Sequence, residues 1–292
     1  MRVKILTDST CDLRKDVLKK YDIGVISLYV NFDDGMYEDG KDIDIECLFG
    51  KVKETRKLPK TSCRSPMDMQ NFFQKYLDEG YDQVFYTGIG GTLSGNFQSA
   101  RIAASEIGED KVVVVDSLNL STGIGLLVLK ACKLRDEGLD AHQIGEKIQE
   151  LVPCVRAQFA VKNLEYLHKG GRCSGTTKVI GTLLRIRPIL RVFNGKILLS
   201  EKIFGIRFEK ALDFQIQDLK NNLEHVDKDY LFITHAEADT EAQYVYDNIP
   251  EDIKSQFKHI YTTRAGCVIS AHCGKGTLGV LYIKDQPLVD DK

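Results

Sequence analysis

The sequence predicts an α/β protein with an N-terminal doubly wound domain, whose sheet is mostly parallel, and a C-terminal α+β domain with an antiparallel hairpin. Up to about residue 151, short apolar runs such as 112–115 alternate with amphipathic helical segments, as in parallel sheets covered by helices. Beyond that point, segments 188–193 and 196–203 flank Asn194-Gly195, a strong hairpin signal. The 292 residues suffice for two domains. We expect domains at 1–160 and 161–292.

Apolar periodicity and helix caps give the order of elements in the N-terminal half. Ser65, Pro66 and Asp68 form a helix start, with Ser65 as the N-cap and Asp68 reaching back to it. Residues 33–44 are acidic and contain glycine, which predicts a solvated loop. We expect strands at 2–7, 23–32, 84–86 and 112–115, and helices at 14–20, 47–55, 66–77, 95–103, 117–135 and 141–151.

The C-terminal half has a different pattern, with no internal repeat. A glycine-containing segment at 266–276 carries Cys267, His272 and Cys273. We expect a strand and a short helix within 159–167, a helix at 176–184, the hairpin, helices at 208–223 and 240–248, and strands at 230–234, 259–263 and 277–283.

Composition excludes several classes of function. Forty basic and 42 acidic side chains give a net charge of −2, which argues against nucleic acid or an anionic membrane surface as the main partner. The N-terminus has only five residues before a polar run, and no apolar run approaches the ~20 residues of a membrane span. We therefore expect a first strand in place of a signal peptide, and a cytoplasmic protein.

The eight cysteines contain no CxxC pair, so we expect free thiols. Cys267, His272 and Cys273 form the only close group of metal-ligand residue types. A closed metal site needs a fourth ligand, and none stands nearby. We expect no metal and no cofactor.

The glycine-rich turn at 88–93 lies between a buried strand and a helix for which Ser94 is the expected N-cap. Free N–H groups at a helix N-terminus, with hydroxyls of Thr92 and Ser94, could hold a phosphate or carboxylate. Such a turn also arises simply where a chain must reverse tightly. It matches neither the dinucleotide fingerprint, since Leu93 replaces the third glycine, nor a P-loop.

Two further polar groups are candidates for ligand binding. Since Ser65 caps its helix, Thr61 and Ser62 have no evident structural task, and either a ligand role or plain loop polarity accounts for them. Asp8 and Ser9 end the first strand, where they either cap the next helix or lie at the ligand-binding edge of a parallel sheet.

These pieces, in their order and spacing, resemble the DegV family of bacterial fatty-acid-binding proteins, the lipid-presenting subunits of fatty acid kinase systems. The resemblance covers nearly the whole chain. It rests on 7–10, on Thr61-Ser62 before a Ser-Pro helix, on 93–95 with 98–100, on Asp116-Ser117, on 164–167 leading to 170–172, on 187–190, and on His272 in a glycine-rich turn.

The resemblance implies that a long-chain fatty acid lies between the two domains. Its carboxylate is then expected at the hydroxyls of Thr61 and Ser94, with Ser62 nearby and His272 approaching from the second domain. Arg172 and Arg207 are expected to contact the ligand or the partner. The implied partner is the kinase catalytic subunit, with at most transient membrane contact, and the chain itself has no catalytic residues.

The chain departs from the family pattern at Cys63-Arg64, Asn96-Phe97 and Lys275, and Arg64 and Lys275 are expected to add positive charge near the head group. Two other functions stay open. Ser94, His272 and Asp8 could form the triad of an acyl hydrolase, although Thr92 and Asn96 replace the glycines of a nucleophile elbow. A phosphate- or nucleotide-binding enzyme would need a carboxylate cluster for Mg²⁺, which the sequence does not show.

Overall fold

The structure is a computed structural model that describes residues 1–162, 164–173 and 186–289. The described residues form three sheets. The first has the order β2-β1-β6-β7 and is entirely parallel, which confirms the expected α/β class. Its strands are β1 (Val3–Asp8), β2 (Gly24–Ile26), β6 (Gln83–Gly88) and β7 (Val112–Asp116).

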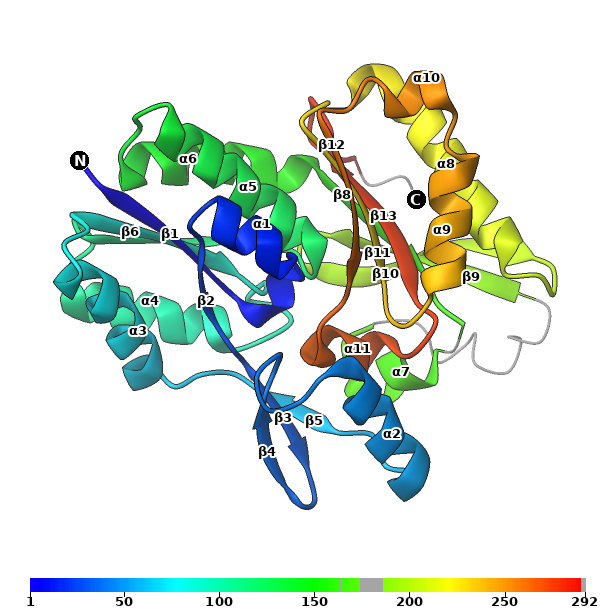
Figure 1. The fold of residues 1–292 in the computed structure, drawn as a ribbon, viewed down its shortest axis with the longest axis horizontal. Helices are drawn as coiled ribbons and strands as arrows, with labels where there is room; N and C mark the ends of the chain where they lie inside the picture. Colours follow the sequence, from blue (N-terminus) through cyan, green and yellow to red (C-terminus); the bar gives the residue numbers. More distant parts are fainter. Residues whose placement is uncertain (163, 174–185, 290–292) are drawn as a thin grey trace.

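Helices cover both faces of this sheet, with α3 and α4 on one side and α5 and α6 on the other (Figure 1). Helix α5 packs against β1 and β6 and also against β8, β11 and β13 of the second sheet. Because it touches both sheets, it is apolar almost all round and buried from Thr122 to Cys132. The helices are α1 (Lys15–Lys20), α3 (Pro66–Asp78), α4 (Asn96–Ile107), α5 (Thr122–Asp136) and α6 (Ala141–Leu151).

The second sheet is mixed, with the order β10-β9-β8-β13-β11-β12. Only β11 and β12 pair in parallel. The predicted hairpin is confirmed, because β9 and β10 pair antiparallel around Asn194 and Gly195, which have φ of 47° and 74°. The strands are β8 (Val155–Ala160), β9 (Ile186–Phe193), β10 (Lys196–Phe204), β11 (Tyr230–His235), β12 (His259–Arg264) and β13 (Leu278–Ile283).

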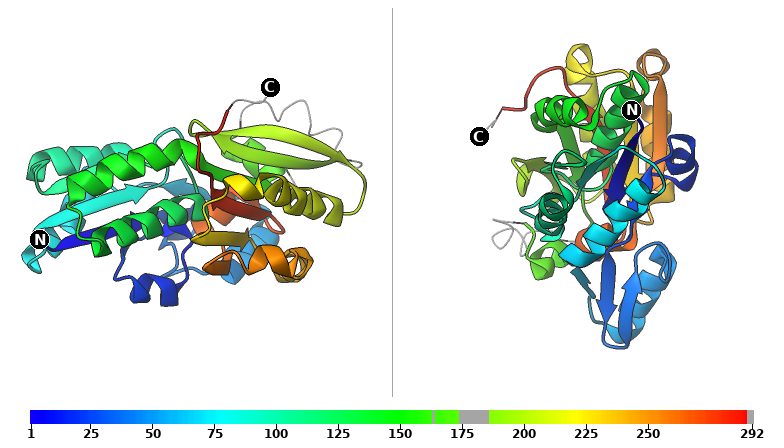
Figure 2. Two further views of the ribbon diagram at one scale, coloured as in Figure 1. Left: turned by 90° about the horizontal axis from the view of Figure 1, so that it is seen from above. Right: turned by 90° about the vertical axis from the view of Figure 1, so that its left-hand side faces the viewer.

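Figures 1 and 2 show this sheet in the half of the molecule opposite the N-terminus. Helices α8 and α9 pack on it, α8 against β8, β9 and β13 and α9 against β11. The other elements that the structure describes in this half are η2 (Val152–Cys154), α7 (Glu165–Gly170), α8 (Glu209–Asn222), η5 (Leu223–His225), α9 (Asp239–Asn248), α10 (Glu251–Lys254) and α11 (Cys267–Cys273).

The third sheet was not predicted. The segment 23–32 is two strands, β2 and β3 (Tyr29–Phe32), in different sheets, and the expected loop 33–44 contains β4 (Gly35–Glu38). Thr61 and Ser62 lie in β5 (Lys60–Ser62), which pairs with β3. These strands are three or four residues long, and α2 (Ile45–Thr55) lies between β4 and β5 in the sequence. Pairing between segments therefore determines these strands more than local sequence does.

One predicted helix begins later than expected. The helix expected from residue 117 begins at Thr122, because Leu118 and Ser121 have φ of 47° and 53°, which no helix accommodates. The capping box of Ser65 and Asp68 is confirmed.

The helix predicted at 176–184 lies outside the described residues. The domain boundary at 160 stays a prediction; by sheet membership β8, which ends at Ala160, goes with the C-terminal strands.

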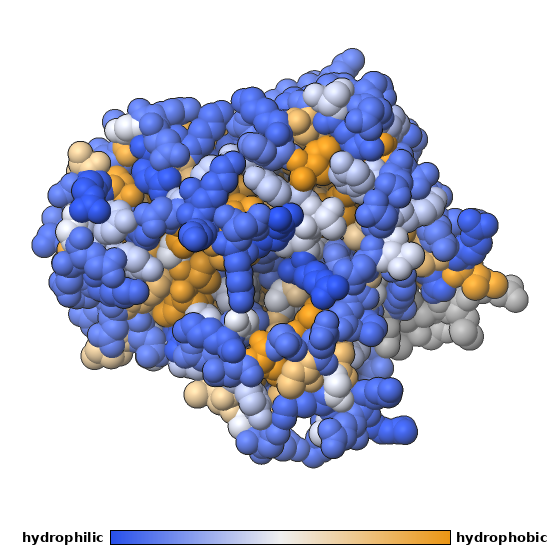
Figure 3. Space-filling model, viewed as in Figure 1, coloured by the Kyte–Doolittle hydropathy of each residue, from blue (hydrophilic) through white to orange (hydrophobic). Residues whose placement is uncertain are grey.

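Within the described residues, the helices are too short or too polar to cross a lipid bilayer. The face in Figure 3 is mainly hydrophilic, and on the part that the structure describes the apolar residues show in several separate patches.

Candidate functional site

A cavity of about 300 Å³ lies between the two halves of the chain. Its walls come from the N-terminal half through β5, the turn before α4 and the loop before α5, and from the C-terminal half through the segment after α7, β10 and α11. The lining residues are Leu28, Thr61, Ser62, Cys63, Ile89, Leu93, Ser94, Gly95, Leu120, Arg172, Ile197, Val268, Ile269, His272 and Cys273.

Polar side chains gather at one part of this wall. The Thr61 hydroxyl lies 2.7 Å from Nε2 of His272, a contact that joins β5 to α11. The Ser62 hydroxyl accepts a hydrogen bond from the Asn31 amide at 3.0 Å. The Ser94 hydroxyl accepts a 3.3 Å bond from the Asn96 N–H. The structure thus brings the four expected head-group residues together around one cavity.

Ser94 is not the N-cap of α4, contrary to the sequence prediction. Gly95 holds that position and caps without a side chain. The N–H groups of Leu93 and Ser94 bond to the Gly90 carbonyl, at 2.9 and 3.1 Å, so a separate turn precedes the helix. Among the described residues, the Ser94 hydroxyl accepts from the Asn96 N–H and donates to no acceptor, so its hydrogen can point to a ligand.

His272 is neutral around pH 7. Burial, with a smaller contribution from the charge of Arg172, lowers its pKa to about 4. Its Nδ1 is buried without a hydrogen-bond partner among the described residues. In the tautomer that carries hydrogen on Nε2, the imidazole donates to Thr61 and leaves the Thr61 hydroxyl free to donate into the cavity.

Gly170, at the end of α7, allows this position of His272. A Cβ at residue 170 would lie 2.5 Å from Nδ1 of His272. We therefore expect Gly170→Ala to displace the imidazole from its buried position, and the pKa of His272 to rise from about 4 toward its ordinary 6.5. An NMR titration of the imidazole measures this shift. Gly50→Ala is the control, since open space surrounds that helical glycine; equal midpoints in both variants would contradict the expectation.

The two expected arginines lie in different places. Arg172 is at the rim of the cavity, where it donates to the carbonyls of Gly170, at 2.6 Å, and Leu93, at 3.4 Å. Arg207 does not line the cavity; its side chain is 79% exposed and lies 3.8 Å from Glu209. The structure therefore places only Arg172 within reach of a ligand in this cavity.

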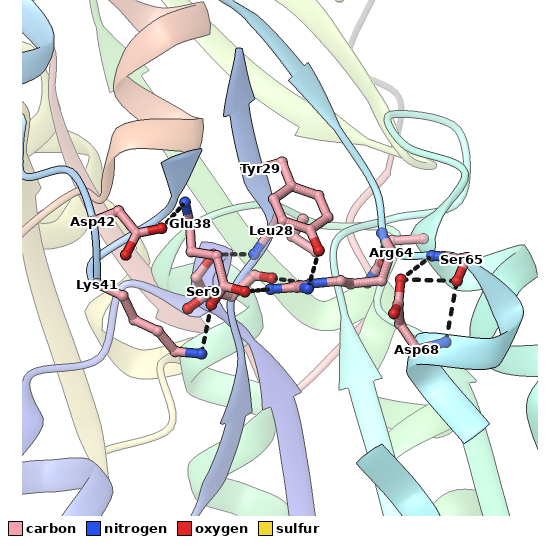
Figure 4. Close-up of polar contacts among 11 residues, drawn as sticks. Ser9, Leu28, Tyr29, Glu38, Lys41, Asp42, Arg64, Ser65 and Asp68 are labelled. Atoms are coloured by element: carbon pink, nitrogen blue, oxygen red, sulfur yellow. Dashed lines mark hydrogen bonds and ion pairs between the residues drawn. The ribbon is translucent and has the colours of Figure 1, made fainter. Parts of the chain in front are cut away.

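The expectation that Arg64 and Lys275 add positive charge at the head group is wrong. Neither residue lines the cavity. Arg64 is buried and donates to the Ser27 carbonyl at 2.5 Å and to the Tyr29 hydroxyl. Figure 4 shows its guanidinium directed at Tyr29 and Glu38, the latter an ion pair of 2.8 Å. Lys275 pairs with Glu237 at 2.7 Å. Both charges are therefore matched by carboxylates outside the cavity.

The other part of the wall is apolar and continues deeper. Leu120, Ile269 and Cys273 also line a second, mostly apolar space of about 30 Å³ that reaches Phe159 and Leu281 of the six-stranded sheet. Sequence reasoning missed these residues, because they come from separate elements and look like ordinary core residues in the sequence. The cavity thus has hydroxyls at one end and hydrocarbon at the other.

The arrangement does not assemble the triad that the sequence left open. Asp8 is fully buried, and its carboxylate accepts from Thr10, Tyr86, Ile89 and Asn96. No hydrogen bond between described residues joins it to His272, whose ring contacts the Thr61 hydroxyl. In the described part of the chain, no three His, Cys, Asp or Glu side chains are grouped as a metal ion requires.

The known proteins that this chain is similar to belong to one family. A family model described as "Uncharacterised protein, DegV family" matches residues 2–285. A DegV domain-containing protein of Clostridium acetobutylicum is 36% identical over 283 residues, which is 97% of this chain and 99% of that protein.

Solved structures agree with this match. A structure described as fatty acid binding of a DegV family protein from Thermus thermophilus has a TM-score of 0.85 and 30% identity, and covers 97% of this chain and 100% of its own. DegV of Bacillus subtilis, described as a fatty acid binding protein, has a TM-score of 0.83, 27% identity and coverages of 97% and 99%. A stearic acid-binding protein from Eubacterium ventriosum has a TM-score of 0.81, 27% identity and coverages of 97% and 98%.

Proposed function

The chain belongs to the DegV family, and on this premise we propose that it binds a long-chain fatty acid in the cavity between its two halves. The carboxylate lies at Thr61 and Ser94, with Ser62 and His272 beside them, and the acyl chain runs along the apolar wall toward Leu120 and Ile269. The observation that carries the proposal is this polarity of one cavity, with hydroxyls at one end and hydrocarbon at the other.

The energetics favour an aliphatic acid. Each buried methylene contributes about 0.8 kcal/mol, so a long chain gains on the order of 10 kcal/mol before ordering costs. Hydrogen bonds to the carboxylate contribute roughly 1.5–3 kcal/mol each, much of which replaces lost hydration. The tail therefore supplies most of the affinity, and the hydroxyls determine which end faces the opening.

We further propose that the chain presents this carboxylate to a kinase subunit for acyl phosphate formation, and that it has no catalytic residues of its own. Thr61, His272 and Arg172 also border an open groove of about 870 Å³, and Ser94 and Arg172 border a second one of about 570 Å³. A bound carboxylate is thus close to open surface. In this proposal Arg172 and Arg207 contact the partner, and the protein acts in the cytoplasm.

Replacing Ser94 with Ala is expected to weaken retention of fatty acid, roughly tenfold to a hundredfold, because one hydrogen bond to a charged group is lost. Native mass spectrometry of protein purified from cells measures how much aliphatic acid stays bound. Ser105→Ala, at an exposed position of the same helix, is the control. Equal retention in the two variants would remove Ser94 from the head-group site.

An assay for turnover separates the proposed binding role from catalysis. Incubated alone with p-nitrophenyl esters or with ATP, the protein is expected to convert neither. Steady-state turnover that Ser94→Ala abolishes would support a hydrolase and overturn the non-catalytic assignment.

A further inference from the structure

Helix α11 forms much of the cavity wall, with Val268, Ile269, His272 and Cys273. It has only seven residues, and a helix this short is not stable without tertiary contacts. Its position therefore depends on the groups that hold its two ends. The end that carries His272 is held by Thr61, from the N-terminal half of the chain.

The other end of α11 is held by two carboxylates, also from the N-terminal half. Asp12, which follows the 3-10 turn Ser9–Cys11 after β1, accepts the Gly266 N–H at 2.7 Å. Asp39, at the end of β4, accepts the Cys267 N–H at 2.7 Å and the Val268 N–H at 3.4 Å. These N–H groups have no partner within the helix, so the carboxylates satisfy the first donors of α11.

Both carboxylates are almost fully buried, with Asp12 5% and Asp39 3% exposed. Among the described residues, no Lys or Arg forms an ion pair with either of them. Neutral donors replace their hydration: the helix N–H groups for both, and for Asp12 also the Ser121 hydroxyl at 2.5 Å. Burial raises the pKa of both carboxyl groups. A buried carboxyl group without a cation depends strongly on its hydrogen bonds, so the two side chains and the start of α11 fix each other in place.

The backbone groups of Asp12 and Asp39 are held in place as well. The Thr263 hydroxyl donates to the Asp12 carbonyl at 2.8 Å, and the Asp39 N–H donates to the Leu28 carbonyl at 2.9 Å. Leu28 itself lines the cavity. The contacts of Asp39 therefore connect two lining residues of the cavity, Leu28 from the N-terminal half and Val268 from α11.

We infer that Asp12 and Asp39 are positioning residues of the fatty acid site: they hold α11 so that His272 meets Thr61 and the apolar wall faces the acyl chain. The inference rests on the proposed function for its ligand. Neither residue lines the cavity, so each acts through α11 and not by touching the fatty acid.

The test compares Ala with Asn at both positions in the full chain, because Asn keeps a side-chain oxygen for the short bond to α11 and Ala does not. Equilibrium dialysis with palmitate is expected to show a dissociation constant on the order of tenfold higher for Asp39→Ala and Asp12→Ala, and within about twofold of the parent for Asp39→Asn and Asp12→Asn. Asp140→Ala, which removes the cap of α6 far from the cavity, is expected to leave the constant unchanged.

A second readout separates positioning from a general loss of stability. The NMR titration midpoint of His272 is expected near pH 4 in the parent, because burial lowers its pKa to about 4. It is expected to move toward its ordinary value in the Ala variants and to stay in the Asn and Asp140→Ala variants. Folded Ala variants with an unchanged midpoint and unchanged palmitate affinity would overturn the inference.

If the Ala variants fail to fold, Gly266→Ala decides the question. A Cβ there would lie 3.1 Å from the Asp39 carboxylate and 3.3 Å from that of Asp12, so it presses α11 away from both. The same loss of affinity and shift of midpoint support the inference, and no change in either overturns it. If the parent itself fails to bind palmitate, the proposed function is wrong, and the His272 midpoints of ligand-free variants still test the positioning role.

Discussion

Replacing Asp8 with Ala is expected to lower the free energy of unfolding by about 4 kcal/mol. The carboxylate is fully buried and accepts from the N–H groups of Thr10 and Ile89 at 3.0 Å, from the Tyr86 hydroxyl at 2.9 Å, from the Asn96 amide at 3.0 Å, and from the Thr10 hydroxyl. Ala leaves these donors buried without an acceptor, and a buried donor without a partner costs about 1–3 kcal/mol before water enters.

Urea denaturation measures this change, with Asp116→Ala as the comparison. Asp116 is half-buried and, among the described residues, accepts the Gly91 and Leu118 N–H groups, at 3.0 and 2.9 Å. We expect that variant to lose about 1–2 kcal/mol. Equal losses in the two variants would show that the network at Asp8 adds no more stability than an ordinary loop contact.

Acidification is expected to destabilise the ligand-free protein through His272. The pKa of this residue is about 4 in the folded state against an ordinary 6.5, so between these values the unfolded chain binds more protons than the folded one. Stability therefore falls as pH drops through this window, by about 3 kcal/mol for the full shift. His272→Gln removes this part of the pH dependence, because Gln does not titrate.

A bound fatty acid is expected to reverse the sign of this effect. A carboxylate next to Thr61 favours the imidazolium form of His272 and raises its pKa in the complex. Binding then takes up a proton, and palmitate affinity increases as pH falls below 7, by up to about tenfold per pH unit. Dialysis of the parent and of His272→Gln at several pH values measures the difference. Parallel pH profiles for the two proteins would place the carboxylate away from His272.

The sequence predicts those elements of the fold whose signals are local. Asn194-Gly195 produces the hairpin and Ser65 with Asp68 produces the capping box, because both depend on a few adjacent residues. The three-stranded sheet escaped prediction, because β5 consists of Lys60, Thr61 and Ser62, which show no apolar alternation. Its pairing with β3 is a tertiary contact that local propensity does not encode.

The same distinction applies to the site. Thr61 could be selected from the sequence because it is a polar residue without an evident structural task, and Ser94 because it follows a glycine-rich turn; their expected head-group role came from the family resemblance. Arg64 misled the prediction, because the sequence does not show that its guanidinium is buried against Tyr29 and Glu38. The apolar wall could not be found either, because its residues come from separate elements. Nor could the pair Asp12 and Asp39, since their roles come from contacts between residues more than 200 positions apart, such as 228 for Asp39 and Cys267.

The attachment of α11 to the first 62 residues also sets the order of events during synthesis. The contact between Thr61 and His272 spans 211 residues, and that between Asp12 and Gly266 spans 254. Contacts of such separation form late, since a long loop must first close. The cavity wall is therefore complete only after α11 has been synthesised, and a chain that stalls before residue 267 is expected to carry Thr61 and Ser94 but to lack the wall that α11 forms.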